Sequence, residues 1–129
     1  MRTEPENWLM FAREDLQMAN LAIQNQIYNQ ACFHAQQCAE KALKALLACS
    51  GNTPPKIHRL VDLVNLLNPN PLDTINLDVQ LLDRFYLSTR YPGTVPNSED
   101  LVGVEDAQEC IRIATQVLET VSEYMIQQN

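Results

Sequence analysis

The sequence has no long apolar run, no paired cysteines and little positive charge. No apolar segment approaches the roughly 18 residues needed to span a bilayer, and residues 1–6 lack the pattern of a signal peptide. Four cysteines are present, but their spacing shows no pairing, so we expect reduced and mostly buried thiols: Cys32, Cys38, Cys49 and Cys110. We therefore expect a soluble cytoplasmic protein of one domain, residues 1–129, that folds without disulfides or metal.

Cations are outnumbered, with 9 Lys and Arg against 16 Asp and Glu and a net charge of -7. A protein that holds nucleic acid by its phosphates usually presents a broad basic face, so any such contact here must be local. Phosphate-binding loops of the Gly-x-x-x-x-Gly-Lys and Gly-x-Gly-x-x-Gly types are also missing. His34 and Cys38 are spaced to share a metal, but further ligands with sensible spacing are lacking. We expect no cofactor, and no residue is singled out as catalytic.

Apolar residues instead recur at helical spacing throughout the chain. The spacing predicts helices over residues 4–25, 28–50, 60–67 and 77–88, and Gly51 is placed to end the second. The last helix carries a seven-residue apolar rhythm: Val104, Ala107, Ile111, Ala114, Leu118, Val121 and Met125. Without strand-like alternation, this pattern predicts an all-α fold, an up-and-down antiparallel four-helix bundle with a fifth short helix.

A polar strip lies beside the apolar face of the second helix. His34, Gln37, Lys41 and Lys44 fall at helical spacing there. The strip is either part of a binding site or a solvated flank in which Glu40 and Lys44 form an ion pair. Composition alone favours the flank.

Residues 56–59 form the tight cationic cluster of this acidic chain, just after a double proline. Lys56, His58 and Arg59 there could hold a phosphate together with the N–H groups at the start of the next helix. The alternative is that Lys56 and Arg59 are ordinary surface charges and that His58 packs against a neighbouring helix.

A third candidate follows the fourth helix, where Arg90 precedes Tyr91. A guanidinium offers a planar fork for phosphate or carboxylate and stacks on rings. Arg90 could equally bond the last helix carbonyls while Tyr91 plugs the end of the core. The loop of residues 89–98 is long for so small a bundle, as functional loops often are.

These three stretches together resemble the signature stretches of the HEPN family of small helical bundles. They are the alanine-rich segment 35–47, His58-x-Leu60 with the leucines that follow, and Tyr86-x-x-Thr89-Arg90-Tyr91-Pro92, in the same order and at similar separations. The resemblance implies a five-helix fold that commonly forms a homodimer. It also implies a minimal nucleotidyltransferase partner in a two-component module of the toxin–antitoxin kind.

Some HEPN proteins cut RNA with an Arg-x(4–6)-His motif, and this sequence departs from it. Neither His34 nor His58 has an arginine at the required distance before it, and Gly93 stands where an acid usually follows Arg-Tyr-Pro. The departure favours a non-catalytic protein that binds a nucleotide or a nucleotidyltransferase. The alternatives are a metal-independent RNA-cleaving toxin with an unorthodox histidine, or a purely structural dimerisation module.

The ligand-binding site expected from the sequence consists of His34, Lys41, His58, Arg59, Arg90 and Tyr91. It requires the fold to bring His58 and Arg90 to a shared recess that solvent can reach. RNA is a less favoured ligand because of the acidic balance, and no membrane contact is expected.

Overall fold

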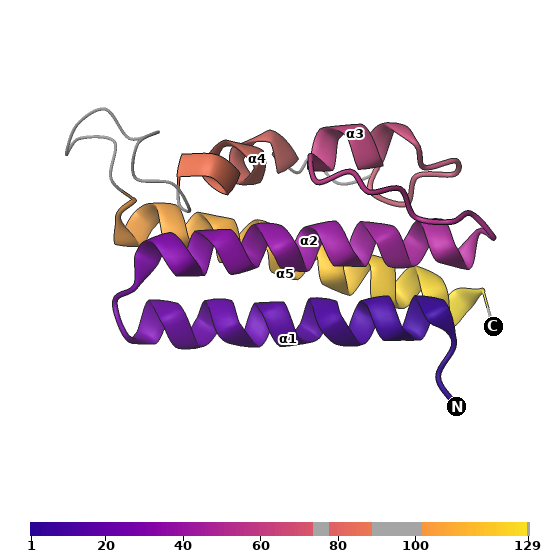
Figure 1. Ribbon diagram of the computed structural model, residues 1–129, viewed down its shortest axis with the longest axis horizontal. Helices are drawn as coiled ribbons and strands as arrows, with labels where there is room; N and C mark the ends of the chain where they lie inside the picture. Colours follow the sequence, from indigo (N-terminus) through magenta and orange to yellow (C-terminus); the bar gives the residue numbers. More distant parts are fainter. Residues whose placement is uncertain (74–77, 89–101, 129) are drawn as a thin grey trace.

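The computed structural model describes residues 1–73, 78–88 and 102–128, and within these ranges the regular structure is helical, without strands. The three long helices are α1 (Glu4–Gln24), α2 (Tyr28–Cys49) and α5 (Val104–Gln127). Two short helices, α3 (Leu60–Asn65) and α4 (Val79–Ser88), lie one after the other along α2 (Figure 1). The predicted all-α bundle is confirmed, with α3 and α4 sharing its fourth position.

Capping contacts and one left-handed glycine explain where the first of these helices begins and where the second ends. Thr3 Oγ1 accepts a hydrogen bond from Glu6 N–H at 3.4 Å and caps α1, as the sequence predicts. After α2, Gly51 has a φ of +84°, and the N–H groups of Gly51 and Asn52 bond the carbonyls of Ala48 and Leu47. This is the left-handed helix stop predicted for Gly51.

The two short helices begin and end inside their predicted ranges. α3 stops at Asn65, two residues before its predicted end, and α4 begins at Val79, after Asp78. The Asp78 carboxylate accepts from Leu81 N–H at 3.2 Å and so caps α4. Leu82 is fully buried, and it anchors α4 to the core.

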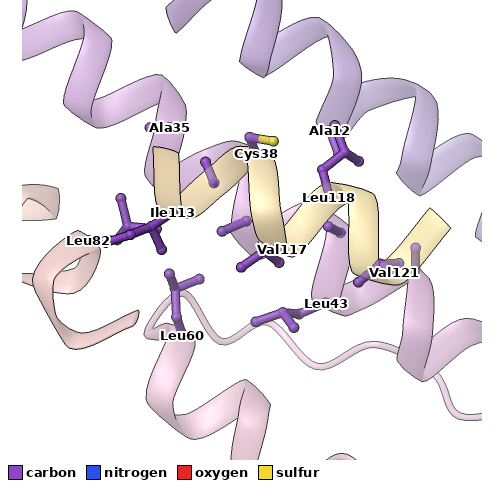
Figure 2. Packing of buried hydrophobic residues seen from close by; sticks show 14 of the residues in the cluster. Ala12, Ala35, Cys38, Leu43, Leu60, Leu82, Ile113, Val117, Leu118 and Val121 are labelled. Carbon is purple, nitrogen blue, oxygen red and sulfur yellow. The ribbon is translucent and has the colours of Figure 1, made fainter. Parts of the chain in front are cut away.

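Helix α2 is the centre of the core and contacts every other helix. Its buried alanines leave room for the close approach of neighbouring helices, and part of the core that they share with α1 and α5 is shown in Figure 2. The fully buried alanines of the three long helices are Ala12, Ala19, Ala31, Ala35, Ala39, Ala42, Ala45, Ala107 and Ala114. The alanine-rich composition of α2 therefore serves helix packing, as expected.

The buried face of α5 is broader than the predicted seven-residue seam. Cys110, Ile113 and Val117 lie outside that seam yet are fully buried, whereas Val104 within it is exposed. The physical reason is that α5 packs against both α1 and α2, so a single stripe of residues cannot cover the contact.

All four cysteines are free thiols, and three are buried. Cys49 is the exposed one, so the thiols are mostly buried, as expected. Burial, with the nearby Asp15 charge, raises the pKa of Cys38 to about 12. Hydrogen bonding to Cys110 and burial also raise the pKa of Cys32. Among the described helices, none combines the length and the apolar composition needed to cross a membrane.

Candidate functional site

Helix α2 presents its polar residues in two directions. His34 and Lys41 are seven residues apart, which is close to two helical turns, so they share one face and turn toward α1. Gln36, Glu40 and Lys44 are spaced four apart on a second face. The polar strip of the sequence therefore forms two clusters.

The first cluster is centred on Asp15, a buried carboxylate on α1. His34 Nδ1 lies 2.9 Å from Asp15 Oδ1, and Lys41 Nζ lies 2.5 Å from Asp15 Oδ2. Each carboxylate oxygen thus holds one partner. The side chains of His34 and Lys41 are only 23% and 28% exposed, so they are not a solvated flank.

The second cluster is centred on Glu40, another buried carboxylate. Lys44 Nζ lies 3.1 Å from Glu40 Oε2, and both Glu40 oxygens lie 3.3 Å from His58 Nδ1. Lys44 also sits 5.6 Å from the centre of the Trp8 ring, a cation–π contact. The predicted Glu40–Lys44 pair is confirmed, but it is buried rather than solvated.

His58 is held from three sides although it lies in a loop. The fully buried Gln36 donates from Nε2 to the His58 carbonyl at 2.8 Å, and Glu40 faces the ring nitrogen Nδ1. Tyr86 of α4 stacks on the imidazole with centroids 5.7 Å apart and an interplanar angle of 14°. The side chain nevertheless remains 56% exposed.

A run of rings joins the two clusters. His34 meets Phe33 edge-on at 5.3 Å, and Phe33 lies 6.1 Å from Tyr86, which in turn stacks on His58. These side chains come from α2, the loop before α3, and α4. The fold therefore brings both histidines into one continuous polar and aromatic surface.

The start of α3 differs from the expected phosphate-binding position. Its first backbone N–H groups, of Leu60 and Val61, donate to the Asp83 carboxylate at 2.8 and 3.2 Å. A carboxylate from α4 thus fills the place expected for an anion. Arg59 is exposed and pairs loosely with Asp62 at 3.7 Å on the surface.

Arg90 and Tyr91 lie outside the described residues, and with them the predicted recess shared by His58 and Arg90. Of the other predicted residues, His34 and Lys41 meet on Asp15, His58 belongs to the Glu40 cluster, and Arg59 lies at the surface. Within the described ranges, no three side chains of the His, Cys, Asp and Glu types are grouped as ligands for a metal ion.

Asp15, Glu40, Gln36 and Tyr86 were not among the predicted site residues. One signal was available for Asp15: it falls between Ala12 and Ala19 on the buried stripe of α1, where an acid needs a partner. Gln36 and Tyr86 lie within the signature stretches, but their contacts with His58 depend on the loop and on α4 folding back onto α2.

Comparisons with known proteins agree with this architecture. The HEPN domain family matches residues 5–124. A protein of Methanocaldococcus jannaschii that bears the name "Putative toxin MJ1304" is 29% identical over 126 residues, which cover 88% of this chain and 83% of that protein.

Two solved structures are similar along nearly their whole length. TT1696 from Thermus thermophilus is 29% identical with a TM-score of 0.80, covering 95% of this chain and 98% of that one. ST0689, described as an archaeal HEPN homologue, is 31% identical with a TM-score of 0.75, covering 96% and 99%. The likeness therefore extends over nearly the whole bundle.

Proposed function

The chain belongs to the HEPN domain family, and from that premise we propose that it is the toxin-like subunit of a two-component module. In this proposal it binds a nucleotide, a minimal nucleotidyltransferase partner, or both, and does not itself catalyse a reaction. The M. jannaschii protein named "Putative toxin MJ1304" supports the toxin-like role, since it is similar along most of both chains.

The observation that carries the proposal is the exposed His58 ring, fixed in place by Glu40, Gln36 and Tyr86. A half-exposed ring that is held by two side chains, on a backbone fixed by a third, is already ordered for contact with a ligand. Lys56 and Arg59 flank it in sequence and are exposed, so they supply positive charge beside it. An anionic ligand or an acidic partner surface would complement this part of the molecule.

The lysines of the two clusters contribute less to anion binding than the sequence suggests. Lys41 and Lys44 already face the carboxylates of Asp15 and Glu40, which neutralise them. We therefore assign ligand contact to His58 and Arg59, with Arg90 and Tyr91 as further predicted contacts. His34 and Lys41 instead join α1 to α2, the helix whose Gln36 and Glu40 hold His58.

Calorimetric titration with ATP tests the nucleotide part of this proposal. We expect binding by the wild type and weaker binding by His58→Ala and Arg90→Ala, while Lys41→Met changes affinity little because its charge is already paired. An absence of binding heat, or equal affinity of Arg90→Ala, would count against it. Co-purification with a nucleotidyltransferase encoded beside this chain tests the partner.

RNA cleavage is the second candidate, and the Glu40–His58 contact favours it. A carboxylate at Nδ1 fixes the orientation of an imidazole and leaves Nε2 to act as acid or base. If this is the activity, induced expression arrests growth and degrades RNA, and His58→Ala relieves both. Normal growth without any partner protein would rule it out.

We also propose that the protein is a cytoplasmic homodimer. The exposed residues Phe11, Met18 and Leu21 lie at helical spacing on α1 and give one outward apolar face that a second copy could cover.

A further inference from the structure

The exposed surface of the His58 side chain belongs to a definite part of the ring. One face of the imidazole is covered by Tyr86, and the Nδ1 edge faces Glu40. The side chain is nevertheless 56% exposed. Its accessible surface must therefore come mainly from the second ring face and from the edge that carries Nε2.

This outer face has a fixed position and orientation. Gln36 holds the backbone of His58, Glu40 holds one ring nitrogen, and Tyr86 sets the plane of the ring. Because the ring is already ordered, a ligand that stacks on it loses little binding energy to the ordering of the protein. The geometry thus suits a flat ligand that needs a rigid surface.

We propose that the outer face of His58 receives the base of a mononucleotide, which extends the ring series Phe33, Tyr86 and His58 by one member. This inference deepens the proposed nucleotide binding and rests on it. Bases stack on aromatic side chains whatever their sequence, because every base presents a π face. Lys56 and Arg59, which flank His58 in the sequence and are exposed, are the cations expected to meet the phosphates of such a nucleotide.

The charge of the chain favours a small ligand over a long strand. With a net charge of -7, the protein repels an extended polyanion, and its cations near His58 are few. A single nucleotide needs only local positive charge. The nucleobase is the chemistry shared by a free nucleotide and an RNA strand, so the test includes both sources.

The test compares three probes by calorimetry: ATP, inorganic tripolyphosphate without a base, and a single-stranded hexamer of adenylate. The variants are His58→Ala, which removes the ring, and His58→Phe, which keeps a flat ring on Tyr86 while Lys44 still pairs with Glu40. Ile126→Ala, which shortens an exposed apolar side chain at the end of α5, is the control. Circular dichroism confirms that each variant is folded.

We expect His58→Ala to weaken ATP binding about tenfold, as for the loss of one stacked base, and to leave tripolyphosphate binding unchanged. His58→Phe and Ile126→Ala should retain the wild-type affinity for ATP. Equal losses of ATP affinity in His58→Ala and His58→Phe would overturn the stacking role. Tripolyphosphate binding as tight as that of ATP would overturn it too. Either result would still be compatible with binding of the phosphates. If the hexamer binds more tightly than ATP, the ligand is a nucleic-acid strand and the assignment of a mononucleotide is wrong. If none of the probes binds the wild type, both this inference and the proposed nucleotide binding fail.

Discussion

Asp15 and Glu40 each hold one lysine and one histidine. Both partners of Asp15 lie on another helix, whereas Glu40 pairs with Lys44 of its own helix and with His58 of the following loop. Asp15 joins α1 to α2, and Glu40 joins α2 to the loop that carries His58. Each carboxylate is itself buried. The loss of either charge would leave a lysine without its counter-ion inside the bundle.

Asp15→Asn tests the first of these clusters. The amide keeps the shape of the side chain but removes the charge that faces Lys41 and His34, so we expect a loss of about 1–2 kcal/mol in the free energy of unfolding. Urea denaturation measures it. Glu14→Gln, at the exposed neighbouring position, is the control and should stay within about 0.5 kcal/mol of wild type. Equal stabilities of the two variants would show that the cluster contributes nothing.

Thiol reactivity follows the burial of the four cysteines. In the native protein at pH 8, a thiol reagent should modify Cys49 quickly and the other three slowly, because these are buried and the pKa values of Cys32 and Cys38 are raised. In denaturant all four should react. Cys49→Ser should abolish the fast reaction. Fast modification of a second cysteine in that variant would contradict the packing of the core.

The raised pKa of Cys38 also sets a direction for stability at alkaline pH. Above about pH 8.5 the unfolded thiol loses its proton, while the folded thiol keeps it up to about pH 12. The unfolded state then binds fewer protons, so the free energy of unfolding should fall as pH rises through this window. Cys38→Ala should show a shallower decline between pH 8 and 10 in urea denaturation. An unchanged slope would contradict the assignment.

The sequence identified the polar strip and the Glu40–Lys44 pair within it, but not the partner of His34 and Lys41. Lys41 and His34 could be placed on one helical face from their spacing alone. Their pairing with Asp15 depends on how α1 is rotated against α2, and local spacing does not determine that rotation. Arg90 and Tyr91 remain predictions, since they fall outside the described part of the chain.

Helix boundaries were predictable where a residue type enforces them. Gly51 ends α2 as expected, but α1 ends in the same way without glycine: Gln26 takes the left-handed conformation at φ 63°. The N–H groups of Gln26 and Ile27 bond the carbonyls of Ile23 and Ala22. The residue type gave no sign of this turn, because glutamine is not among the residues that favour the left-handed conformation.

Gly51→Ala tests the stop after α2. A Cβ atom at this position would meet no atom within 4 Å, so the cost comes from the left-handed backbone itself. We expect a loss of about 1 kcal/mol in the free energy of unfolding, measured by urea denaturation. Gly51→Asn should lose less, because asparagine tolerates this conformation better. A neutral alanine variant would mean that the turn relaxes into another conformation.

For the whole molecule, helix number and order followed from the apolar periodicity. What the periodicity missed is the breadth of the α5 interface: Cys110, Ile113 and Val117 are also fully buried, because α5 contacts α1, α2 and α4. A stripe read from one helix cannot reveal how many partners that helix has.

The exposed apolar face of α1 predicts that the protein is a dimer in solution. Light scattering at micromolar concentration should give twice the chain mass of 14.7 kDa. Met18→Glu, on the exposed apolar face of α1, should shift the protein toward the monomer, because it places a charge where a second copy would pack. Glu119→Gln, at an exposed position on α5, should not. A monomeric wild type would contradict the proposed dimer.

Helix α4 contacts the segment around His58 through two side chains that lie about one helical turn apart. Asp83 bonds the N–H groups of Leu60 and Val61, and Tyr86 lies flat on the imidazole. If α4 moves along the bundle, His58 must therefore move with it, or both the Asp83 hydrogen bonds and the Tyr86 stacking contact must break. A partner that binds α4 and shifts it would therefore also change the position of the His58 imidazole, without contacting that ring.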